Sequence, residues 1–205
     1  MRVMSDAIAR SVDGIVLAAG SSTRFGERKL LSQLCGKPLM NYALETISRS
    51  GIRKIILVVS RYILDDLPPL HEDVEVVLNE ATAEGIASSI ICGLRNAEDS
   101  DAVLLFAADQ PLVTAELIRK LVRAGNKQPD CIIASSFRGI PRNPVLIPRR
   151  FYGELKSLHG DTGAKAIFER HSGKIRKVEL GDETELLDVD TAADLERIRS
   201  ILTRR

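Results

Sequence analysis

Residues 14–29 read Gly-Ile-Val-Leu-Ala-Ala-Gly-Ser-Ser-Thr-Arg-Phe-Gly-Glu-Arg-Lys, and this stretch decides the fold. The small and apolar residues Ile15–Ala19 predict a short buried strand. The strand leads into Gly20-Ser21-Ser22-Thr23, a turn of small residues that is followed by the cations Arg24 and Lys29. Small residues let backbone N–H groups approach an anion closely, and two nearby cations neutralise its charge. The stretch therefore favours phosphate binding.

The spacing of the glycines separates this stretch from two common phosphate-binding loops. A Walker A loop has four residues between its glycines and then Lys-Ser/Thr, whereas five residues stand between Gly20 and Gly26. A dinucleotide-binding loop has the pattern Gly-x-Gly-x-x-Gly, which Gly20 does not begin. On the local pattern alone, an ordinary glycine turn beside surface cations stays an alternative.

Strand-like and helix-like segments alternate along the rest of the chain. Apolar, β-branched runs predict strands at Ile15–Ala18, Lys54–Val59, Val74–Leu78, Ala102–Ala107, Cys131–Ser135 and Ile175–Leu180. Helical spacing and caps predict helices at about Leu39–Ser50, Ile86–Arg95, from a Thr114 N-cap onward, and at Phe151–Leu158, Thr162–His171 and Thr191–Leu202. This order favours a single-domain α/β fold with a mostly parallel sheet and helices on both faces.

Residues 138–148 interrupt the pattern with three prolines. Since proline cannot donate to a β-ladder, this segment predicts a short edge strand or an irregular one. We expect residues 1–13 to form a flexible N-terminal extension and residues 14–205 to form the domain. In sheets of this kind ligands bind beyond the carboxyl ends of the strands, so residues 20–29 are expected at a ligand site.

Composition and charge limit the class of protein. The 205 residues are 44% hydrophobic and 28% charged, with a formal net charge of +1, which is typical of a soluble globular domain. We therefore expect a small nucleotide as the ligand, and neither nucleic acid nor a membrane as a partner. No apolar run has membrane-spanning length, and residues 1–13 lack the apolar centre expected of a secretory signal. Three dispersed cysteines suggest neither a disulfide framework nor a zinc site. A cytoplasmic location is the expectation.

A carboxylate follows the strand predicted at Ala102–Ala107. The chain continues as Ala108-Asp109-Gln110-Pro111, and an acid at the carboxyl end of a central strand is well placed to hold a divalent metal between phosphates. The alternative is that Asp109 caps the next helix. Thr114 offers a better cap, which favours the metal-binding role.

Two more carboxylates stand near the end of the chain, in Leu187-Asp188-Val189-Asp190-Thr191. Positions two apart in an extended segment share a face, so both carboxylates can reach a common cation. Alternatively, Asp190 or Thr191 caps the last helix and Asp188 is solvated. Mg²⁺ takes few carboxylates and completes its shell with phosphate oxygens, so one of these acids together with Asp109 would suit it. Whether Asp188 or Asp190 is that ligand stays open.

The chain resembles the nucleotidyltransferases that build NDP-sugars and related cofactors. Its first motif, Leu-Ala-Ala-Gly-Ser-Ser-Thr-Arg-Phe-Gly-x-x-Lys with Gly36-Lys37-Pro38-Leu39, is typical of that superfamily. Later segments resemble its molybdenum cofactor cytidylyltransferase branch, which is related to the molybdenum cofactor guanylyltransferases. They are Asn79 through Ala87-Ser88-Ser89 to Gly93, Ala108-Asp109-Gln110-Pro111, Asn143-Pro144-Val145-Leu146, Gly160-Asp161-Thr162-Gly163-Ala164-Lys165 and Asp188-Val189-Asp190-Thr191. The resemblance implies a Rossmann-like, GT-A-like nucleotidyltransferase fold.

The resemblance also implies roles for single residues. The catalytic residues would be Arg24, Lys29 and Asp109, and the ligands of Mg²⁺ or Mn²⁺ would be Asp109 and Asp190. Nucleotide contacts would come from Leu17, Ala18, Ala19, Gly20, Ser21, Ser22, Lys29, Asn79, Ser88 and Ser89. The acceptor would be faced by Asn143, Pro144, Asp161 and Lys165. For Ser88 and Ser89 a plain helix-start role is the alternative, and for Asp161 a cap of the following helix is the commoner role.

Two departures from the family pattern fall on the acceptor side. Ile140–Pro144 stands where the family usually has a Gly-His-Pro-type element, and Lys165 stands where it usually has an arginine. On the nucleotide side, Ala19 stands where guanylyl-transferring relatives usually carry glycine, which favours CTP.

The implied activity is transfer of CMP from CTP to the phosphate of molybdopterin or its molybdenum-loaded form, with release of pyrophosphate. A molybdenum hydroxylase would receive the product. One alternative is GTP with the same pterin, and another is CTP or a different NTP with a sugar or polyol phosphate. A third is a non-catalytic cofactor carrier or chaperone for a molybdenum hydroxylase. The presence of Arg24, Lys29 and Asp109 argues against a carrier, which does not need them.

Overall fold

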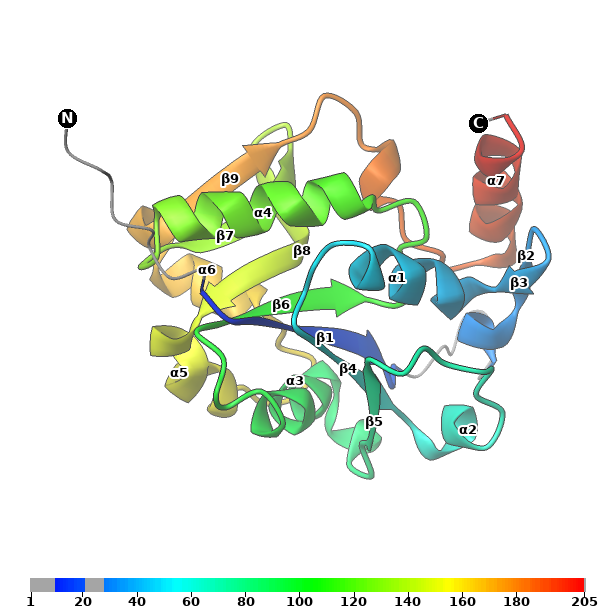
Figure 1. Cartoon of the computed structure of the whole chain (residues 1–205), viewed down its shortest axis with the longest axis horizontal. Coiled ribbons are helices and arrows are strands. Elements are labelled where there is room, and N and C mark those ends of the chain that lie inside the picture. Colours follow the sequence, from blue (N-terminus) through cyan, green and yellow to red (C-terminus); the bar gives the residue numbers. More distant parts are fainter. Residues whose placement is uncertain (1–9, 21–27, 205) are drawn as a thin grey trace.

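The computed structural model describes residues 10–20 and 28–204, and a seven-stranded sheet forms its centre (Figure 1). The strands lie in the order β5 (Val74–Leu78), β4 (Lys54–Val59), β1 (Val12–Ala18), β6 (Ala102–Ala107), β8 (Ile140–Pro148), β7 (Ile132–Phe137) and β9 (Ile175–Glu179). β1 pairs in parallel with both β4 and β6, so the carboxyl ends of these three strands open at one edge. The predicted α/β fold with a mostly parallel sheet is confirmed.

β8 is an interior strand whose register with β7 shifts. Of the two alternatives predicted from its prolines, the edge strand is therefore wrong and the irregular strand is confirmed. It pairs antiparallel with β6 on one side and with β7 on the other. The sheet accommodates the prolines because Pro141 and Pro148 stand near the ends of the strand, whereas Pro144 lies where the register with β7 shifts. Because β8 runs against β6, its first residues reach the edge at which the parallel strands end.

Helices cover both faces of the sheet (Figure 1). On one face lie α1 (Leu39–Ser48) and α4 (Ala115–Lys127), and on the other lie α3 (Ile86–Arg95), α5 (Tyr152–Lys156) and α6 (Lys165–Arg170). The sheet is apolar on both faces, as β1 illustrates, because alternate residues of a strand point to opposite faces. Val16 and Ala18 join the hydrophobic cluster under α1 and α4, whereas Ile15 and Ala19 join the cluster under α3 and α5.

Three smaller elements flank the carboxyl edge of the sheet. The hairpin of β2 (Gln33–Leu34) and β3 (Lys37–Pro38) leads into α1, and the short α2 (Arg61–Leu64) follows β4. The last helix, α7 (Ala192–Leu202), contributes Leu195 and Ile198 to the cluster under α1 and α4.

Several predicted boundaries are confirmed and others shift. The segments predicted at Lys54–Val59, Val74–Leu78, Ile86–Arg95 and Ala102–Ala107 have those bounds in the structure. Thr114 caps α4, since its hydroxyl accepts from the Leu117 N–H at 3.2 Å. The helix predicted from Thr162 begins only at Lys165, with Ala164 at its N-cap and no side-chain cap bond. The expected Asp161 cap is therefore wrong.

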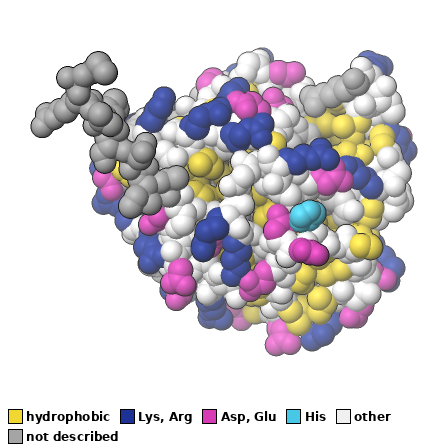
Figure 2. Space-filling model, viewed as in Figure 1, with side chains coloured by type: hydrophobic (Ala, Val, Ile, Leu, Met, Phe, Trp, Pro, Cys, Tyr) yellow, Lys and Arg dark blue, Asp and Glu magenta, His cyan; other side chains and the backbone are white. Residues whose placement is uncertain are grey.

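The first strand begins slightly earlier than predicted, and the surface carries mixed charges. β1 begins at Val12, ahead of the domain start expected at Gly14, while residues 1–9 of the predicted extension lie outside the described residues. Acidic and basic side chains are interspersed on the face shown in Figure 2. Within residues 10–20 and 28–204, no helix combines the length and the apolar character needed to cross a membrane.

Candidate active site

Three charged side chains from distant parts of the chain meet at the carboxyl edge of the sheet. Lys29 begins the short 3₁₀ turn Lys29–Leu31, Asp109 follows β6, and Asp190 precedes α7. The Lys29 Nζ atom lies 2.7 Å from Oδ2 of Asp109 and 3.6 Å from Oδ1 of Asp190. The Lys29 side chain is only 10% exposed, so salt screens its pairing with Asp109 less than it would on an open surface.

The segment before α7 is attached to the end of β6 through its backbone. The Val189 N–H donates to the carbonyl of Asp109 at 3.0 Å, and the Val189 side chain is buried in the core. Thr191 caps α7 in a capping box with Asp194. Because Thr191 is the cap, the carboxylate of Asp190 is not used to cap the helix.

Asp109 and Asp190 are suited to hold a divalent cation between them. Both carboxylates converge on the single ammonium group of Lys29, so one positive centre reaches both. Across the described residues, no three His, Cys, Asp or Glu side chains gather as a metal-binding group. A metal held here would take its other oxygen ligands from a bound phosphate and from water, as Mg²⁺ commonly does.

Asp188 lies in a different environment from Asp190. Solvent reaches its side chain, yet it stands against the wall of a cleft where protein atoms replace much of the surrounding water. This desolvation and the nearby Asp109 carboxylate raise the pKa of Asp188 to about 6, and a hydrogen bond with the Gln110 side chain opposes the rise. Lys29 pairs with Asp190, whereas Asp188 lines the cleft.

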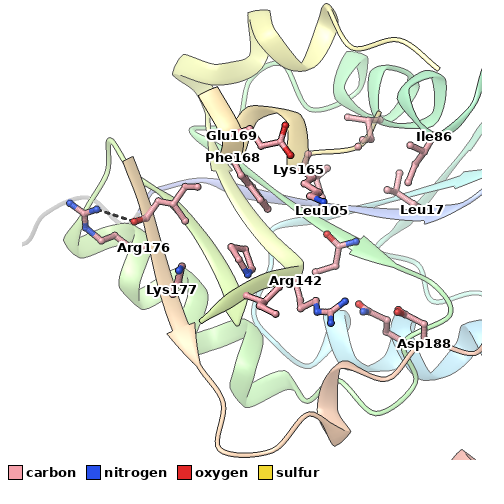
Figure 3. A pocket seen from close by; sticks show the side chains of 18 of the residues that line it. Leu17, Ile86, Leu105, Arg142, Lys165, Phe168, Glu169, Arg176, Lys177 and Asp188 are labelled. Atoms are coloured by element: carbon pink, nitrogen blue, oxygen red, sulfur yellow. Dashed lines mark hydrogen bonds between the residues drawn. The ribbon is translucent and has the colours of Figure 1, made fainter. Parts of the chain in front are cut away.

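The cleft is a pocket of about 740 Å³ that opens beside these carboxylates (Figure 3). Its apolar lining includes Leu17, Ile86, Ile90, Leu105, Ile140, Pro141, Ala164, Phe168 and Ile175. Its polar lining includes Gln110, Arg142, Asn143, Lys165, Glu169, Arg176, Lys177 and Asp188. The size, and the apolar floor with a few polar groups, are typical of a small-molecule site.

Two of the four residues predicted to face the acceptor line this pocket, namely Asn143 and Lys165. Pro144 is buried in β8, where its carbonyl accepts from the Ser135 hydroxyl at 2.9 Å. Asp161 lies beside the start of α3, because a Cβ added at Gly85 would stand 2.6 Å from its Oδ1. Of these four residues, Asn143 and Lys165 therefore line the pocket, whereas Pro144 and Asp161 do not.

The side chains of Asn79, Ser88 and Ser89 come together at the start of α3. The Asn79 amide donates to the Ser88 hydroxyl at 2.8 Å and to the Ser89 hydroxyl at 3.0 Å. The Asn79 side-chain oxygen accepts from the Ala81 N–H, and the Ser88 hydroxyl donates to the Gly85 carbonyl. These bonds brace the turn between β5 and α3. Nucleotide contacts by these side chains stay a prediction.

Residues at the end of β1 divide between the core and the pocket. Leu17 lines the pocket, whereas the Ala18 and Ala19 side chains are buried on opposite faces of the sheet. A base or ribose contact at Ala18 or Ala19 would therefore use their backbone. Gly20 is exposed, and a Cβ added to it would meet no described atom within 4 Å. The other predicted phosphate-binding residues of this loop, Ser21, Ser22 and Arg24, lie outside the described residues.

Gln110 and Arg142 are polar pocket residues that the predicted site did not include. Gln110 is 3% exposed, and its side-chain oxygen is buried without a hydrogen-bond partner in the described structure. Its position directly after Asp109 could have indicated that Gln110 belongs to the site. The other is Arg142, whose signal was its place in the departure from the family pattern at Ile140–Pro144.

The mostly parallel sheet, the pocket and the charged triplet of Lys29, Asp109 and Asp190 at the carboxyl edge are typical of an α/β protein that binds its ligands beyond the ends of its strands. Residues 14–175 match the MobA-like NTP transferase domain. The chain belongs to this family of nucleotidyltransferases.

The relatives of this chain carry names that describe different processes. The chain is 28% identical over 204 residues to the purine catabolism protein PucB of Bacillus subtilis (strain 168), covering 93% of this chain and 97% of that protein. It is 28% identical to the probable molybdenum cofactor guanylyltransferase of Thermococcus kodakarensis, covering 93% of this chain and 96% of the relative. The crystal structure of Rv0371c from Mycobacterium tuberculosis H37Rv in complex with manganese is similar at 25% identity and a TM-score of 0.72. That similarity covers 93% of this chain and 98% of the other.

Proposed function

We propose that the protein transfers CMP from CTP to the terminal phosphate of molybdopterin or of its molybdenum-loaded form. The observation that carries the proposal is the Lys29 ammonium between Asp109 and Asp190, whose chain neighbours Gln110 and Asp188 line a pocket of about 740 Å³. In the proposed reaction the charged side chains would bind a metal-bound triphosphate, and the pocket would bind the acceptor. A group transfer between two bound substrates needs both.

In the proposed reaction an oxygen of the acceptor phosphate attacks the α-phosphorus of CTP. A new phosphorus–oxygen bond forms, and the bond from the α-phosphorus to the oxygen that bridges to the β-phosphate breaks. The electron pair of that bond leaves with pyrophosphate. Because the acceptor phosphate is already anionic near neutral pH, the step needs no strong general base. Catalysis would rest on alignment and on charge neutralisation.

The residues of the charged triplet divide this work. Asp109 and Asp190 would hold Mg²⁺ or Mn²⁺, which when bound neutralises negative charge on the triphosphate and on the leaving pyrophosphate. Lys29 would add a fixed positive charge beside the same phosphates. Arg24 would supply another from the loop outside the described residues. The manganese bound by the Mycobacterium tuberculosis relative supports a divalent metal here.

The pocket supports a flat acceptor that carries negative charge. Phe168, Leu105 and Ile175 give it apolar walls on which a ring system can pack, and Arg142 and Lys165 add positive charge. The relative named as a probable molybdenum cofactor guanylyltransferase supports a pterin as that acceptor. The purified product would be a cytosine dinucleotide cofactor, to be passed to a molybdenum hydroxylase.

Pyrophosphate release tests the proposal when CTP, GTP, ATP and UTP are each supplied with molybdopterin, with its molybdenum-loaded form, and with sugar and polyol phosphates. Release with CTP and the pterin alone is the expected result. Preference for GTP would change the nucleotide, and release with a sugar or polyol phosphate alone would overturn the acceptor. Tight pterin binding without release under all conditions would identify a carrier instead.

A further inference from the structure

The first half of β8 presents an unusual run of residues to the pocket. Side chains of a regular strand alternate between faces, yet the consecutive residues Ile140–Asn143 all line the pocket. The reason is the register shift with β7, where Ala134 pairs with Val145 but Ser135 pairs with Arg142. Such a bulge re-aims side chains that regular pairing would send elsewhere.

Arg142 is the arginine that this bulge turns toward the pocket, and the guanidinium is weakly held. Its ion pair with Glu183 is long, at 3.6 Å, and both side chains are about half exposed, at 48% and 49%. An exposed pair of this kind contributes little to stability. The Arg142 guanidinium can therefore exchange its partner at little cost.

The second arginine of the pocket is bound differently. Arg176 donates from Nε to the Gln128 side chain at 2.7 Å and from Nη1 to the carbonyls of Gly173 and Ile175. Figure 3 shows Arg176 projecting from β9, away from the end of the pocket where Arg142 points toward Asp188. Arg176 is thus committed to its own strand, whereas Arg142 is available to a ligand.

Carboxylates stand at that end of the pocket. Asp188 lines it, and the N–H of the next residue, Val189, donates to the carbonyl of Asp109 at 3.0 Å, so the Asp109 carboxylate belongs to the same region. A phosphate dianion that approached these carboxylates would be repelled unless a positive group met it from the pocket side. A guanidinium binds phosphate through two parallel N–H donors, which suits this task.

We propose that Arg142 is a specificity-determining residue that binds the phosphate terminus of the acceptor, and that Glu183 holds the Arg142 side chain in place until the acceptor replaces it. This inference rests on the proposed function for the identity of the acceptor. It assigns the phosphate to the end of the pocket nearest the charged triplet, and it leaves Lys165 and Lys177 to the remainder of the acceptor.

Steady-state kinetics with the full chain, CTP and molybdopterin test the assignment. Arg142→Met should raise the KM for molybdopterin about 10- to 100-fold and leave the KM for CTP unchanged, while Arg142→Lys should recover part of the loss. Glu183→Gln should lower the KM for molybdopterin, because the competing carboxylate is gone. In the double variant Arg142→Met/Glu183→Gln, the Glu183→Gln change should no longer lower the KM for molybdopterin, because the guanidinium that Glu183 binds is absent.

Arg150→Met is the matched control. Arg150 is also about half exposed and pairs with an exposed carboxylate, that of Asp130, but it does not line the pocket. Its substitution should leave both KM values as in the unaltered protein. Equal KM values for molybdopterin in the Arg142→Met and Arg150→Met variants would overturn the assignment, and so would a Glu183→Gln effect that persists without Arg142.

A binding experiment separates this inference from the proposed function. The nucleotide site is filled with Mg²⁺ and a CTP analogue that has a methylene group between the α- and β-phosphorus atoms, and inorganic phosphate is titrated by calorimetry. The Glu183→Gln variant should bind phosphate more tightly than the unaltered protein, and the Arg142→Met variant should show no phosphate binding. If molybdopterin gives no turnover but this pattern holds, the acceptor is a different phosphate and Arg142 keeps its role. If the variants bind phosphate alike, Arg142 has no such role.

Discussion

The Lys29 Nζ and the Asp109 Oδ2 atoms lie 2.7 Å apart, although 80 positions separate the two residues in the sequence. The pairing of β1 with β6 brings them together, since Lys29 lies beyond the end of one strand and Asp109 beyond the end of the other. The sheet therefore brings the cation and the carboxylate together. The expectations below follow from this arrangement and from the packing around it.

Asp109→Ala should reduce pyrophosphate release by at least about 10²-fold, because it removes a proposed metal ligand and the partner of Lys29. The measurement is turnover with CTP and molybdopterin over a range of Mg²⁺ concentrations. Asp130→Asn is a suitable control, since the side chain is 69% exposed and pairs only with Arg150 among the described residues. Near-normal turnover of folded Asp109→Ala would remove Asp109 from the metal site.

Lys29→Met should separate metal binding from turnover. Its ammonium competes with a metal ion for Asp109 and Asp190, so its removal should strengthen Mn²⁺ binding measured by electron paramagnetic resonance. Turnover should nevertheless fall by about 10²-fold, because a positive charge beside the reacting phosphates is lost. Weaker Mn²⁺ binding in this variant would mean that Lys29 organises the carboxylates and does not compete for them.

Gly85→Ala should destabilise the wall between α3 and α6. Gly85 has φ +83°, and a Cβ there would stand 2.4 Å from the carbonyl carbon of Gly160. The free energy of unfolding should fall by about 1–3 kcal/mol, as measured by urea denaturation. The control is Gly153→Ala in α5, where a Cβ meets nothing within 4 Å and alanine should add about 0.5–1 kcal/mol. An unchanged stability in Gly85→Ala would show that the loop with Gly160 moves freely.

Tyr152 should make stability depend on alkaline pH. Its buried hydroxyl lies 2.8 Å from the Ser100 hydroxyl, and desolvation raises the pKa of Tyr152 to about 12. The folded-state pKa lies above the ordinary value near 10, so this stabilisation is complete below about pH 10 and is lost as the pH rises through 12. The stability advantage of the unaltered protein over Tyr152→Phe should shrink by about 2–3 kcal/mol across this range. Tyr62→Phe, with a 63% exposed ring, should show no such change relative to the unaltered protein.

Local pattern was enough to predict much of the fold. Lys54–Val59 and Ala102–Ala107 are continuously apolar because both faces of their sheet are covered, and their bounds were confirmed. β8 could not be predicted in the same way. Its prolines indicated an edge strand or an irregular strand. Whether a proline interrupts the hydrogen bonds between strands depends on its position in the register, and the partner strands set that register.

In the candidate site, too, some residues could be predicted from the sequence and others could not. Asp109 was predicted from its position after a buried strand. The position of Asp190 left the choice between Asp188 and Asp190 open, and the family resemblance favoured Asp190. Both Asp109 and Asp190 converge on Lys29. Arg142 was left out of the predicted site because an exposed arginine usually has no specific role, and its direction depends on a bulge that local sequence does not predict. The roles proposed for these residues await experiment.

The hydrogen bond from Val189 to Asp109 also ties the end of the domain to its centre. Small single domains fold cooperatively, so Asp190 takes its place together with the burial of Val189 and the capping of α7 by Thr191. The charged triplet is therefore complete only when the last segment of the domain has docked.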